Sequence, residues 1–303
     1  MKLLAVVIPY YKRTFFRECL ASLAAQTDQR FTVYIGNDAS SENPEDLLKE
    51  FEGKFNFVYK KFEENFGRTS LTKHWDRCIE MMEDEEWFMI LGDDDCLGQN
   101  AIESFYESFH EINESHNVVR FSTQIINDCG TKISKVYQQP ESENALRSYQ
   151  RKLLGQNRSS LSEYIFRILK YKKYGLKNYP LAWSVDDRAV IDFCENKDIF
   201  SINRAVVYVR MSASNISSTM AYSNLMQEAI LESSRELIFD YKKKMDRAQL
   251  RFFIENYENC ALIFTKVDRR DLINITKLFL LYMPIKSKIY ILKVILSKAF
   301  TKV

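Results

Sequence analysis

The chain has 303 residues, of which 46% are hydrophobic and 28% charged, and this ordinary globular composition excludes a disordered or fibrous protein. The formal net charge of +2 is too small for a general nucleic-acid binder, so nucleic acid is not an expected partner. The six cysteines are scattered without a Cys-x-x-Cys pair, which predicts reduced thiols in a cytoplasmic protein rather than a zinc site or a disulfide framework.

The first apolar run, residues 3–8, is too short for a secretory signal and ends at Pro9, so it predicts a strand. No stretch approaches the roughly 18 consecutive apolar residues that a membrane-spanning helix needs. We therefore expect a cytoplasmic protein that is soluble or lies peripherally on the inner face of the membrane.

Strands and helices alternate through the first half of the chain. Apolar, β-rich runs predict strands over residues 3–8, 31–35, 55–59, 87–91 and 118–126. Helical spacing predicts helices after a Thr14 cap, after Asn43-Pro44, over about 69–82 and after an Asn100 cap. This order predicts an α/β fold with a doubly wound, mostly parallel sheet and helices on both faces.

The second half changes character. Residues 140–179 are basic with a helical pattern, 205–211 return to a strand, and the chain after about 218 is helical to its end. We therefore expect one domain over 1–217 and an appended helical region over 218–303.

Polar residues follow several of the predicted strands, and ligands of open α/β sheets bind outside such strand ends. The strongest cluster is Asp93-Asp94-Asp95, directly after the buried run from Trp87. Crowded carboxylates raise one another's pKa unless a cation neutralises them, and clustered oxygens suit Mg²⁺ or Mn²⁺ bound to substrate phosphates. The alternative is a solvated acidic turn.

Four segments between residues 3 and 100 carry motifs in a fixed order. They are Val7-Ile-Pro9-Tyr-Tyr with the helix through Gln26, Ile35-Gly-Asn-Asp38-Ala-Ser40, Asn65-Phe-Gly67-Arg68, and Leu91-Gly-Asp93-Asp94-Asp95. Each motif alone is weak, but the ordered set is specific and resembles the family 2 glycosyltransferases, inverting nucleotide-sugar-dependent enzymes of the GT-A fold. The resemblance implies a GT-A-like catalytic domain with its nucleotide-sugar-binding half at 1–100 and its acceptor-side half at 101–217. The chain departs from the family pattern at Gly92 and Asn37, two positions where the family commonly has an aspartate.

The resemblance also implies roles for particular residues. It places the nucleotide-sugar donor, UDP-linked, against Pro9, Tyr11, Asp38, Asn65, Gly67, Arg68, Asp93 and Arg210. Asp38 is expected to accept the uracil N3–H, the alternative being an Asx-turn that holds its loop. Arg68 either contacts the base or a phosphate or is solvated, and Arg210 would neutralise the diphosphate.

The metal ligands implied are Asp94 first and Asp95 second, for Mn²⁺ or Mg²⁺. Ser212 stands where the family often has a histidine, so no histidine ligand is expected, and the three histidines are interpreted as structural or surface residues.

Trp183-Ser-Val-Asp186-Asp187 resembles the family's acidic pair before a helix. Displacement at an anomeric carbon needs a base for the acceptor hydroxyl. Asp187 matches that base, and Asp186 would orient it or bind the acceptor. The alternative is an acidic first helical turn, stabilised by the helix dipole.

The segment Lys266–Val303 holds nine Lys or Arg and two Asp, interleaved with apolar residues. A basic amphipathic helix of this kind lies on anionic lipid or packs its apolar face on the catalytic domain.

The sequence thus predicts transfer of a sugar from a nucleotide-diphosphate donor to a hydroxyl of a glycan or lipid-linked glycan, as in cell-surface polysaccharide synthesis. The alternatives are a sugar-nucleotide nucleotidyltransferase, whose Gly-rich loop is missing after residue 9, and a non-catalytic sugar-nucleotide or glycan-binding module. A Rossmann dehydrogenase lacks support because no Gly-x-Gly-x-x-Gly follows a strand.

Overall fold

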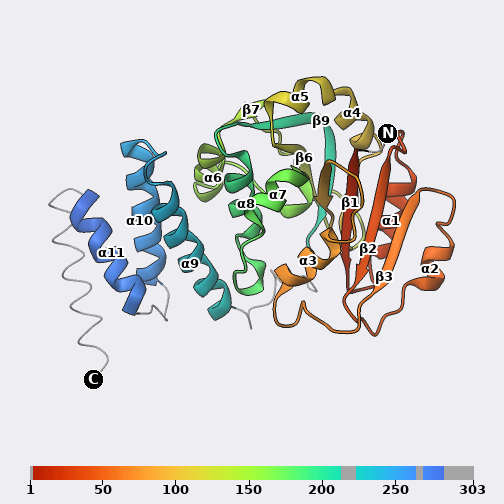
Figure 1. Ribbon diagram of the computed structural model, residues 1–303, viewed down its shortest axis with the longest axis horizontal. Coiled ribbons are helices and arrows are strands. Elements are labelled where there is room, and N and C mark those ends of the chain that lie inside the picture. The colour runs from red at the N-terminus through yellow and green to blue at the C-terminus, as the bar shows by residue number, and fades with distance from the viewer. Residues whose placement is uncertain (1–2, 213–222, 264–268, 283–303) are drawn as a thin grey trace. The chain divides into compact units, whose positions relative to one another are not determined.

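The computed structural model describes residues 3–212, 223–263 and 269–282. The chain forms two compact units, one made of residues 1–178 and 185–218 and the other of 179–184 and 219–303 (Figure 1). The segment Tyr179–Ser184 therefore belongs with the C-terminal helices, and the hydroxyl of Tyr179 donates to Glu236 at 2.9 Å. The division of the chain into domains at 217/218 stays a prediction.

The first unit is built on one mixed sheet, which within the described residues has nine strands in the order β3-β2-β1-β4-β8-β6-β9-β5, with β7 also pairing with β9. The pairs β1–β2, β2–β3, β1–β4 and β6–β9 are parallel, while β8, β5 and β7 run against their neighbours. The predicted α/β class with a mostly parallel sheet is confirmed. The strands are β1 Leu4–Tyr10, β2 Phe31–Asn37, β3 Asn56–Lys61, β4 Trp87–Ile90, β5 Cys96–Leu97, β6 Val118–Ile126, β7 Ser142–Glu143, β8 Tyr164–Arg167 and β9 Ile199–Arg210.

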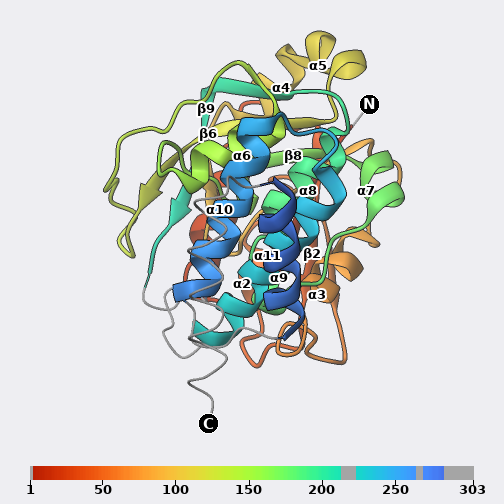
Figure 2. The ribbon, with the colours of Figure 1, turned by 90° about the vertical axis from the view of Figure 1, so that its left-hand side faces the viewer.

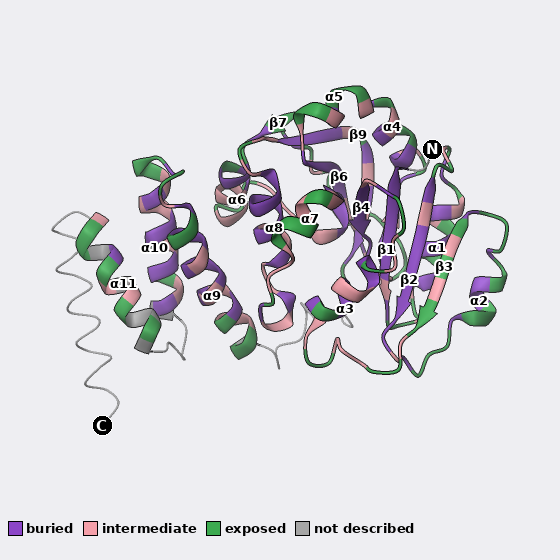
Figure 3. Ribbon diagram, in the orientation of Figure 1, coloured by how far each residue is buried: buried purple, intermediate pink, exposed green. Residues whose placement is uncertain are grey.

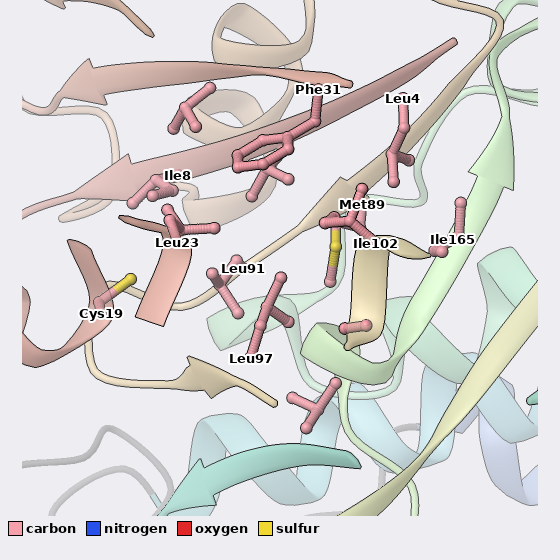
Figure 4. Close-up of a cluster of buried hydrophobic side chains, with 14 of the residues drawn as sticks. Leu4, Ile8, Cys19, Leu23, Phe31, Met89, Leu91, Leu97, Ile102 and Ile165 are labelled. Carbon is pink, nitrogen blue, oxygen red and sulfur yellow. The ribbon is translucent and has the colours of Figure 1, made fainter. Parts of the chain in front are cut away.

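Helices cover both faces of this sheet. On one face, α1 (Phe16–Ala24), α2 (Glu45–Lys49) and α4 (Ala101–Glu107) enclose an apolar core cluster, in which Leu4, Ile8, Phe31 and Met89 meet Leu23 and Ile102 (Figure 4). On the other face, α3 (Leu71–Ile79) contacts β1 and β2. Because β1 and β2 are buried on both faces, their sequences are continuous apolar runs, whereas the edge strand β3 is largely exposed (Figure 3).

The remaining helices of the first unit are α5 Phe109–Ser115, α6 Ala145–Leu153, α7 Ile168–Tyr174 and α8 Val185–Cys194, with the short 3₁₀ turn η1 at Leu161–Glu163. The Thr14 cap was wrong, because α1 begins after Phe15. Asn100 is the N-cap residue of α4 as predicted, but its side chain makes no capping hydrogen bond. In α3, the Ser70 hydroxyl caps the helix by accepting a hydrogen bond from the Lys73 amide.

The helical pattern predicted over 140–179 was wrong at the strands β7 and β8, and the loop expected from Lys170 to Gly175 is largely the helix α7. Tyr164–Arg167 is an antiparallel strand that fills the gap between β4 and β6. Three apolar residues and an arginine, followed by a basic helix, are too short a run to show whether the period is that of a strand or of a helical turn. β9 also begins earlier than predicted, at Ile199, because its first residues pair with β7 and β6.

The second unit is helical, as predicted. Helices α9 (Ser223–Tyr241), α10 (Arg247–Ile263) and α11 (Arg269–Tyr282) pack on one another in sequence, and the 3₁₀ turn η2 (Pro180–Ala182) packs on α9 (Figure 2). Among the residues that the structure describes, no helix has both the length and the apolar character needed to cross a membrane. Of the predicted basic amphipathic segment, residues 266–268 and 283–303 lie outside the described residues.

Candidate functional site

The acidic triplet lies in the turn between β4 and β5, where it contacts the end of β1. One carboxylate oxygen of Asp93 accepts hydrogen bonds from the backbone amides of Tyr11 (2.8 Å) and Lys12 (2.9 Å). These two amides fix Asp93 against the loop that follows the first strand. The predicted residues Asp93 and Tyr11 are therefore brought together, with the ring of Tyr11 46% exposed.

Asp95 is held from two further directions. Its Oδ2 accepts from the hydroxyl of Ser162 at 2.5 Å, and its Oδ1 accepts from the backbone amide of Arg210 at 2.8 Å. Ser162 also accepts from the Gly92 amide at 3.1 Å, so one hydroxyl joins η1 to the end of β4. Asp95 is buried, and both of its oxygens are engaged by protein groups.

Asp94 differs from its two neighbours. Within the described ranges its carboxylate accepts no hydrogen bond from another residue, so its oxygens are available to a ligand. Gly92 belongs to the same arrangement, because a Cβ there would lie 2.8 Å from Oδ1 of Asp94 and 3.2 Å from Oδ2 of Asp95. The departure from the family's aspartate at this position thus leaves room for the two carboxylates that follow.

The electrostatics of the triplet favour a bound cation. Burial, followed by the charge of Asp94, raises the pKa of Asp93 to about 7 and also raises the pKa of Asp95. In the described part of the chain, no group of three or more His, Cys, Asp or Glu side chains is arranged to hold a metal by itself. The residues present fit a Mg²⁺ or Mn²⁺ ion held by one or two carboxylates together with substrate phosphates.

Arg210 contacts the triplet through its backbone amide and through its buried side chain. Its Nε donates to the Asp94 carbonyl at 2.9 Å and its Nη1 to the Asn127 carbonyl at 2.7 Å, while Nη2 pairs with Glu18 and the guanidinium stacks on Phe15. With the side chain 0% exposed, these contacts hold the triplet in place. Glu18 and Ser162, neither of which the motifs indicated, complete this frame.

A second cluster surrounds Asp38 at the end of β2. The carboxylate accepts from the amides of Phe66 and Gly67, both at 2.8 Å, and pairs with Arg77 of α3. A Cβ at Gly67 would lie 2.6 Å from Asp38 Oδ2, so a glycine is required for this close approach. Asp38 therefore tethers the loop that contains Asn65 and Gly67.

Within the loop that directly follows β2, the side chain that accepts a local backbone hydrogen bond is Asn37 rather than Asp38. Its Oδ1 accepts from the Ser40 amide at 2.9 Å and its Nδ2 donates to the Tyr59 hydroxyl at 2.9 Å. The Ser40 hydroxyl donates in turn to the carbonyl of Tyr11 at 2.5 Å. The ends of β1 and β2 are thereby joined, with Pro9 of β1 opposite Gly36 of β2.

Arg77 is the residue of this cluster that the motifs missed. Its guanidinium stacks on the rings of Phe62 and Phe66, and its Nε donates to Nδ1 of His74 at 3.1 Å. Arg68, by contrast, has an exposed side chain, and its backbone amide donates to Oδ1 of Asn65 at 2.8 Å. The exposed side chain of Arg68 can thus reach a ligand, whereas the guanidinium of Arg77 already contacts Asp38, Phe62, Phe66 and His74.

The predicted acidic pair lies in the first turn of α8, where Asp187 meets Lys152 of α6. The Lys152 Nζ is 2.7 Å from both oxygens of Asp187 and 3.9 Å from Asp186. Burial, and next the charge of Asp186, raises the pKa of Asp187, while Lys152 lowers it. Lys152 and Asp187 line a small cavity of about 10 Å³ together with Ser159 and Tyr164.

One segment connects the acidic pair with the triplet. Ser159 and Tyr164 line the cavity beside Asp187, while Ser162 of the same segment donates to Asp95. The segment 159–164 therefore lies beside both the predicted base, Asp187, and the predicted metal ligand Asp95. The Asp38 cluster lies at the ends of β2 and α3, where the Asp38 amide donates to the Tyr10 carbonyl at 3.1 Å.

Comparisons with known proteins give the family and the fold. The family model described as Glycosyl transferase family 2 matches residues 5–169, which is more than half of the chain. Glycosyltransferase GlyG of Streptococcus pneumoniae serotype 4 is 26% identical over 111 residues, which is 36% of this chain and 36% of that protein. The match thus spans about a third of the length of this curated relative.

Solved structures share the fold over most of the chain. Residues 1–349 of S. aureus TarS in complex with UDP-GlcNAc superpose with a TM-score of 0.67 at 16% identity, covering 92% of this chain and 80% of that one. The same fragment in complex with UDP gives a TM-score of 0.64 at 15% identity, covering 92% and 81%. With the matched family model, the two strand-end acidic clusters and the shared fold, the chain belongs to glycosyl transferase family 2.

Proposed function

We propose that this chain is an inverting glycosyltransferase that moves a sugar from a nucleotide-diphosphate donor, UDP-linked, to a hydroxyl of a glycan or lipid-linked glycan. The observation that carries the proposal is which carboxylates of the acidic triplet already accept hydrogen bonds from the protein. Asp93 and Asp95 are fixed by amides and a hydroxyl, while Asp94 between them has open oxygens. The TarS structures that share the fold hold UDP-GlcNAc and UDP, which supports a UDP-linked donor.

Asp94 would hold Mn²⁺ or Mg²⁺, with Asp95 as the second candidate ligand. When bound, the ion stabilises the negative charge of the departing diphosphate. Asp93 would hold the donor beside the β1 loop. Arg210 would keep Asp94 and Asp95 in position through its hydrogen bonds to the Asp94 carbonyl and the Asp95 carboxylate. Because Arg210 is buried against carbonyls and Glu18, we propose this supporting role for it in place of direct diphosphate binding.

The nucleobase would lie between the loops after β1 and β2. Tyr11 offers an exposed ring beside Pro9, and Arg68 an exposed guanidinium beside Asn65 and Gly67. Both oxygens of Asp38 already accept amide hydrogen bonds, so a uracil N3–H would have to share one of them.

The acceptor would be activated at α8. As the acceptor oxygen forms its bond to the anomeric carbon, the bond from that carbon to the diphosphate oxygen breaks and the electron pair leaves with the diphosphate. The hydroxyl proton passes to Asp187, and attack opposite the leaving group inverts the anomeric configuration. Lys152 keeps Asp187 ionised despite its burial, and Asp186 would orient the acceptor.

A lipid-linked acceptor would agree with a peripheral position on the inner membrane face. The described part of the basic C-terminal segment, α11, exposes Ile273, Leu280 and Leu281, the last at 72%. This apolar surface supports the membrane contact that the sequence predicts, which stays a proposal.

The test is calorimetric binding of UDP, GDP and dTDP, each with and without Mn²⁺, to the wild type and to Asp94→Ala. Asp84→Ala is the matched control, because Asp84 is an exposed aspartate in the turn before β4. We expect metal-dependent binding of UDP that Asp94→Ala loses and Asp84→Ala retains. Failure of the wild type to bind any of the three nucleotides would count against the transferase and favour a non-catalytic module.

A further inference from the structure

The cationic side chains near the acidic triplet and near the Asp186–Asp187 pair differ in whether protein groups already accept their hydrogen bonds. Arg210 donates to backbone carbonyls and to Glu18, and Lys152 is held by both oxygens of Asp187. Arg158 is different: its Nη1 is buried, and in the described part of the chain it has no hydrogen-bond partner. A buried guanidinium N–H without a partner costs stability, so a site of this kind indicates a missing anionic or polar ligand.

The backbone around Arg158, whose Nη1 lacks a partner among the described residues, is itself held by hydrogen bonds. The carbonyl of Arg158 accepts from Gln139 Nε2 at 3.4 Å, and the neighbouring Asn157 donates to Oε1 of Gln139 at 3.4 Å. On the other side, Ser160 and Glu163 form a reciprocal capping box around η1. The backbone that presents Arg158 is therefore held at both ends.

The same short segment reaches the triplet. Ser162, four residues after Arg158, donates to Asp95 at 2.5 Å. Burial raises the pKa of Asp95 and of Glu163, and the positive charge of Arg158 acts against this rise in both. Asn157 Oδ1 and Glu163 Oε1 are also buried, and neither has a hydrogen-bond partner among residues 3–212, 223–263 and 269–282.

We propose that Arg158 is a donor-binding residue whose guanidinium takes the phosphate oxygens of a nucleoside diphosphate held beside Asp94. The inference rests on the proposed function and assigns the cationic side of its donor site, which Arg210 is too buried to supply. A planar guanidinium forks onto phosphate oxygens, and such charge-assisted hydrogen bonds are about twice as strong as neutral ones. The alternative is that Arg158 is a fixed countercharge for Asp95 and Glu163.

The experiment compares UDP with uridine, which carries the same base and ribose but no phosphate. UDP binding in the presence of Mn²⁺ is measured by calorimetry, and uridine binding by ligand-observed NMR. The proteins are the wild type, Arg158→Gln, Arg158→Lys and the control Arg147→Gln, which removes an exposed arginine of α6. Loss of a charged hydrogen bond predicts roughly 10- to 100-fold weaker UDP binding by Arg158→Gln, with uridine binding unchanged.

Arg158→Lys should retain part of the UDP affinity, since it keeps the charge and loses the fork, and Arg147→Gln should bind as the wild type does. Equal UDP affinity of the wild type and Arg158→Gln would overturn the inference. So would equal losses for UDP and uridine together with a lower melting temperature, because these indicate the countercharge role. A wild type that binds no UDP contradicts the proposed function itself, which is a distinct result.

Discussion

Lys152 determines the protonation state of the candidate base. Burial of Asp187 and the adjacent Asp186 favour the neutral acid, whereas the ammonium 2.7 Å from both oxygens favours the carboxylate. Burial alone would lower the pKa of Lys152, but Asp187 and Asp186 raise it well above its usual value. The pair is therefore charged on both sides at neutral pH, with Asp187 ready to accept a proton.

Removal of either aspartate should separate their roles. We expect Asp187→Asn to lower kcat by roughly 10²- to 10⁴-fold, the usual contribution of a general base. Asp186→Asn should act mainly on KM for the acceptor, because it leaves the proton acceptor in place. Both are checked by steady-state kinetics with a UDP-sugar, and a larger loss of kcat in Asp186→Asn would transfer the base role to Asp186.

Replacement of Lys152 should shift the pH dependence of the reaction. Without the ammonium, burial and Asp186 act on Asp187 unopposed, so its pKa rises and the carboxylate protonates at higher pH. Lys152→Met should therefore move the acidic limb of the kcat–pH profile upward, whereas Lys172→Met, on the exposed side of α7, should leave it in place. An unchanged acidic limb in Lys152→Met would show that Lys152 does not act on the base.

The sequence could identify site residues only where a motif carries them. The carboxylates at strand ends, Asp38 and Asp93 to Asp95, stand in short ordered patterns. Their partners are far away in the chain: Ser162 is 67 residues from Asp95, and Glu18 is 192 from Arg210. No local pattern encodes such pairs, because they depend on which elements the fold places side by side.

The same reasoning applies to the elements. β1 and β2 were predicted within two residues at each end, because strands buried on both faces give continuous apolar runs. β6 was predicted with the bounds that the structure has, although polar residues from Arg120 to Gln124 interrupt its apolar run. β8 was missed because its four residues become a strand only through the neighbours β4 and β6. Tertiary pairing, rather than local propensity, determines its conformation.

A buried ionic cluster joins β6, β7 and α6. Arg120 of β6 is 1% exposed, and it contacts Glu143 of β7 at 2.7 Å and Ser148 of α6 at 2.6 Å. Arg151 of α6 contacts the other oxygen of Glu143 at 2.7 Å. One carboxylate therefore neutralises two arginines between three elements.

Glu143→Ala should destabilise the protein by about 3–5 kcal/mol, because it leaves Arg120 buried without a countercharge. Urea unfolding measures the change, and Glu141→Ala, an exposed glutamate two residues earlier, should stay within about 0.5 kcal/mol of the wild type. The double variant Arg120→Met, Glu143→Leu should recover much of the loss. Similar stabilities of Glu143→Ala and Glu141→Ala would contradict the assignment of Glu143 as the central countercharge.

Global stability should depend on pH through His74. Burial, and then the charge of Arg77, lowers the pKa of His74 from 6.5 to about 3, so the folded protein holds a neutral imidazole. Although Asp38 lies 3.4 Å from Nδ1, that nitrogen accepts a hydrogen bond from Arg77 and cannot also carry a proton. The unfolded chain binds a proton below about pH 6.5 that the folded protein does not bind until about pH 3.

The contribution of His74 to stability is therefore fully present above about pH 6.5 and is lost as the pH falls from there toward 3. Thermal unfolding between pH 7 and 5 should show a shallower decline of Tm for His74→Gln than for the wild type. His110→Gln is the matched control, because His110 is exposed on α5. Parallel Tm curves for His74→Gln and the wild type would mean that His74 is charged in the fold.

The position of β8 has a consequence for how the chain is made. β1 to β4 leave the ribosome first and pair in parallel, but the open edge of β4 is filled only by residues 164–167. β6 is also made before β8, so the edge of β6 that pairs with β8 is unpaired during the same period. Exposed strand edges are the sites where nascent chains join wrong partners. Translation through residue 167 therefore ends the exposure of the β4 edge, while the second edge of β6 stays open until β9 (Ile199–Arg210) follows.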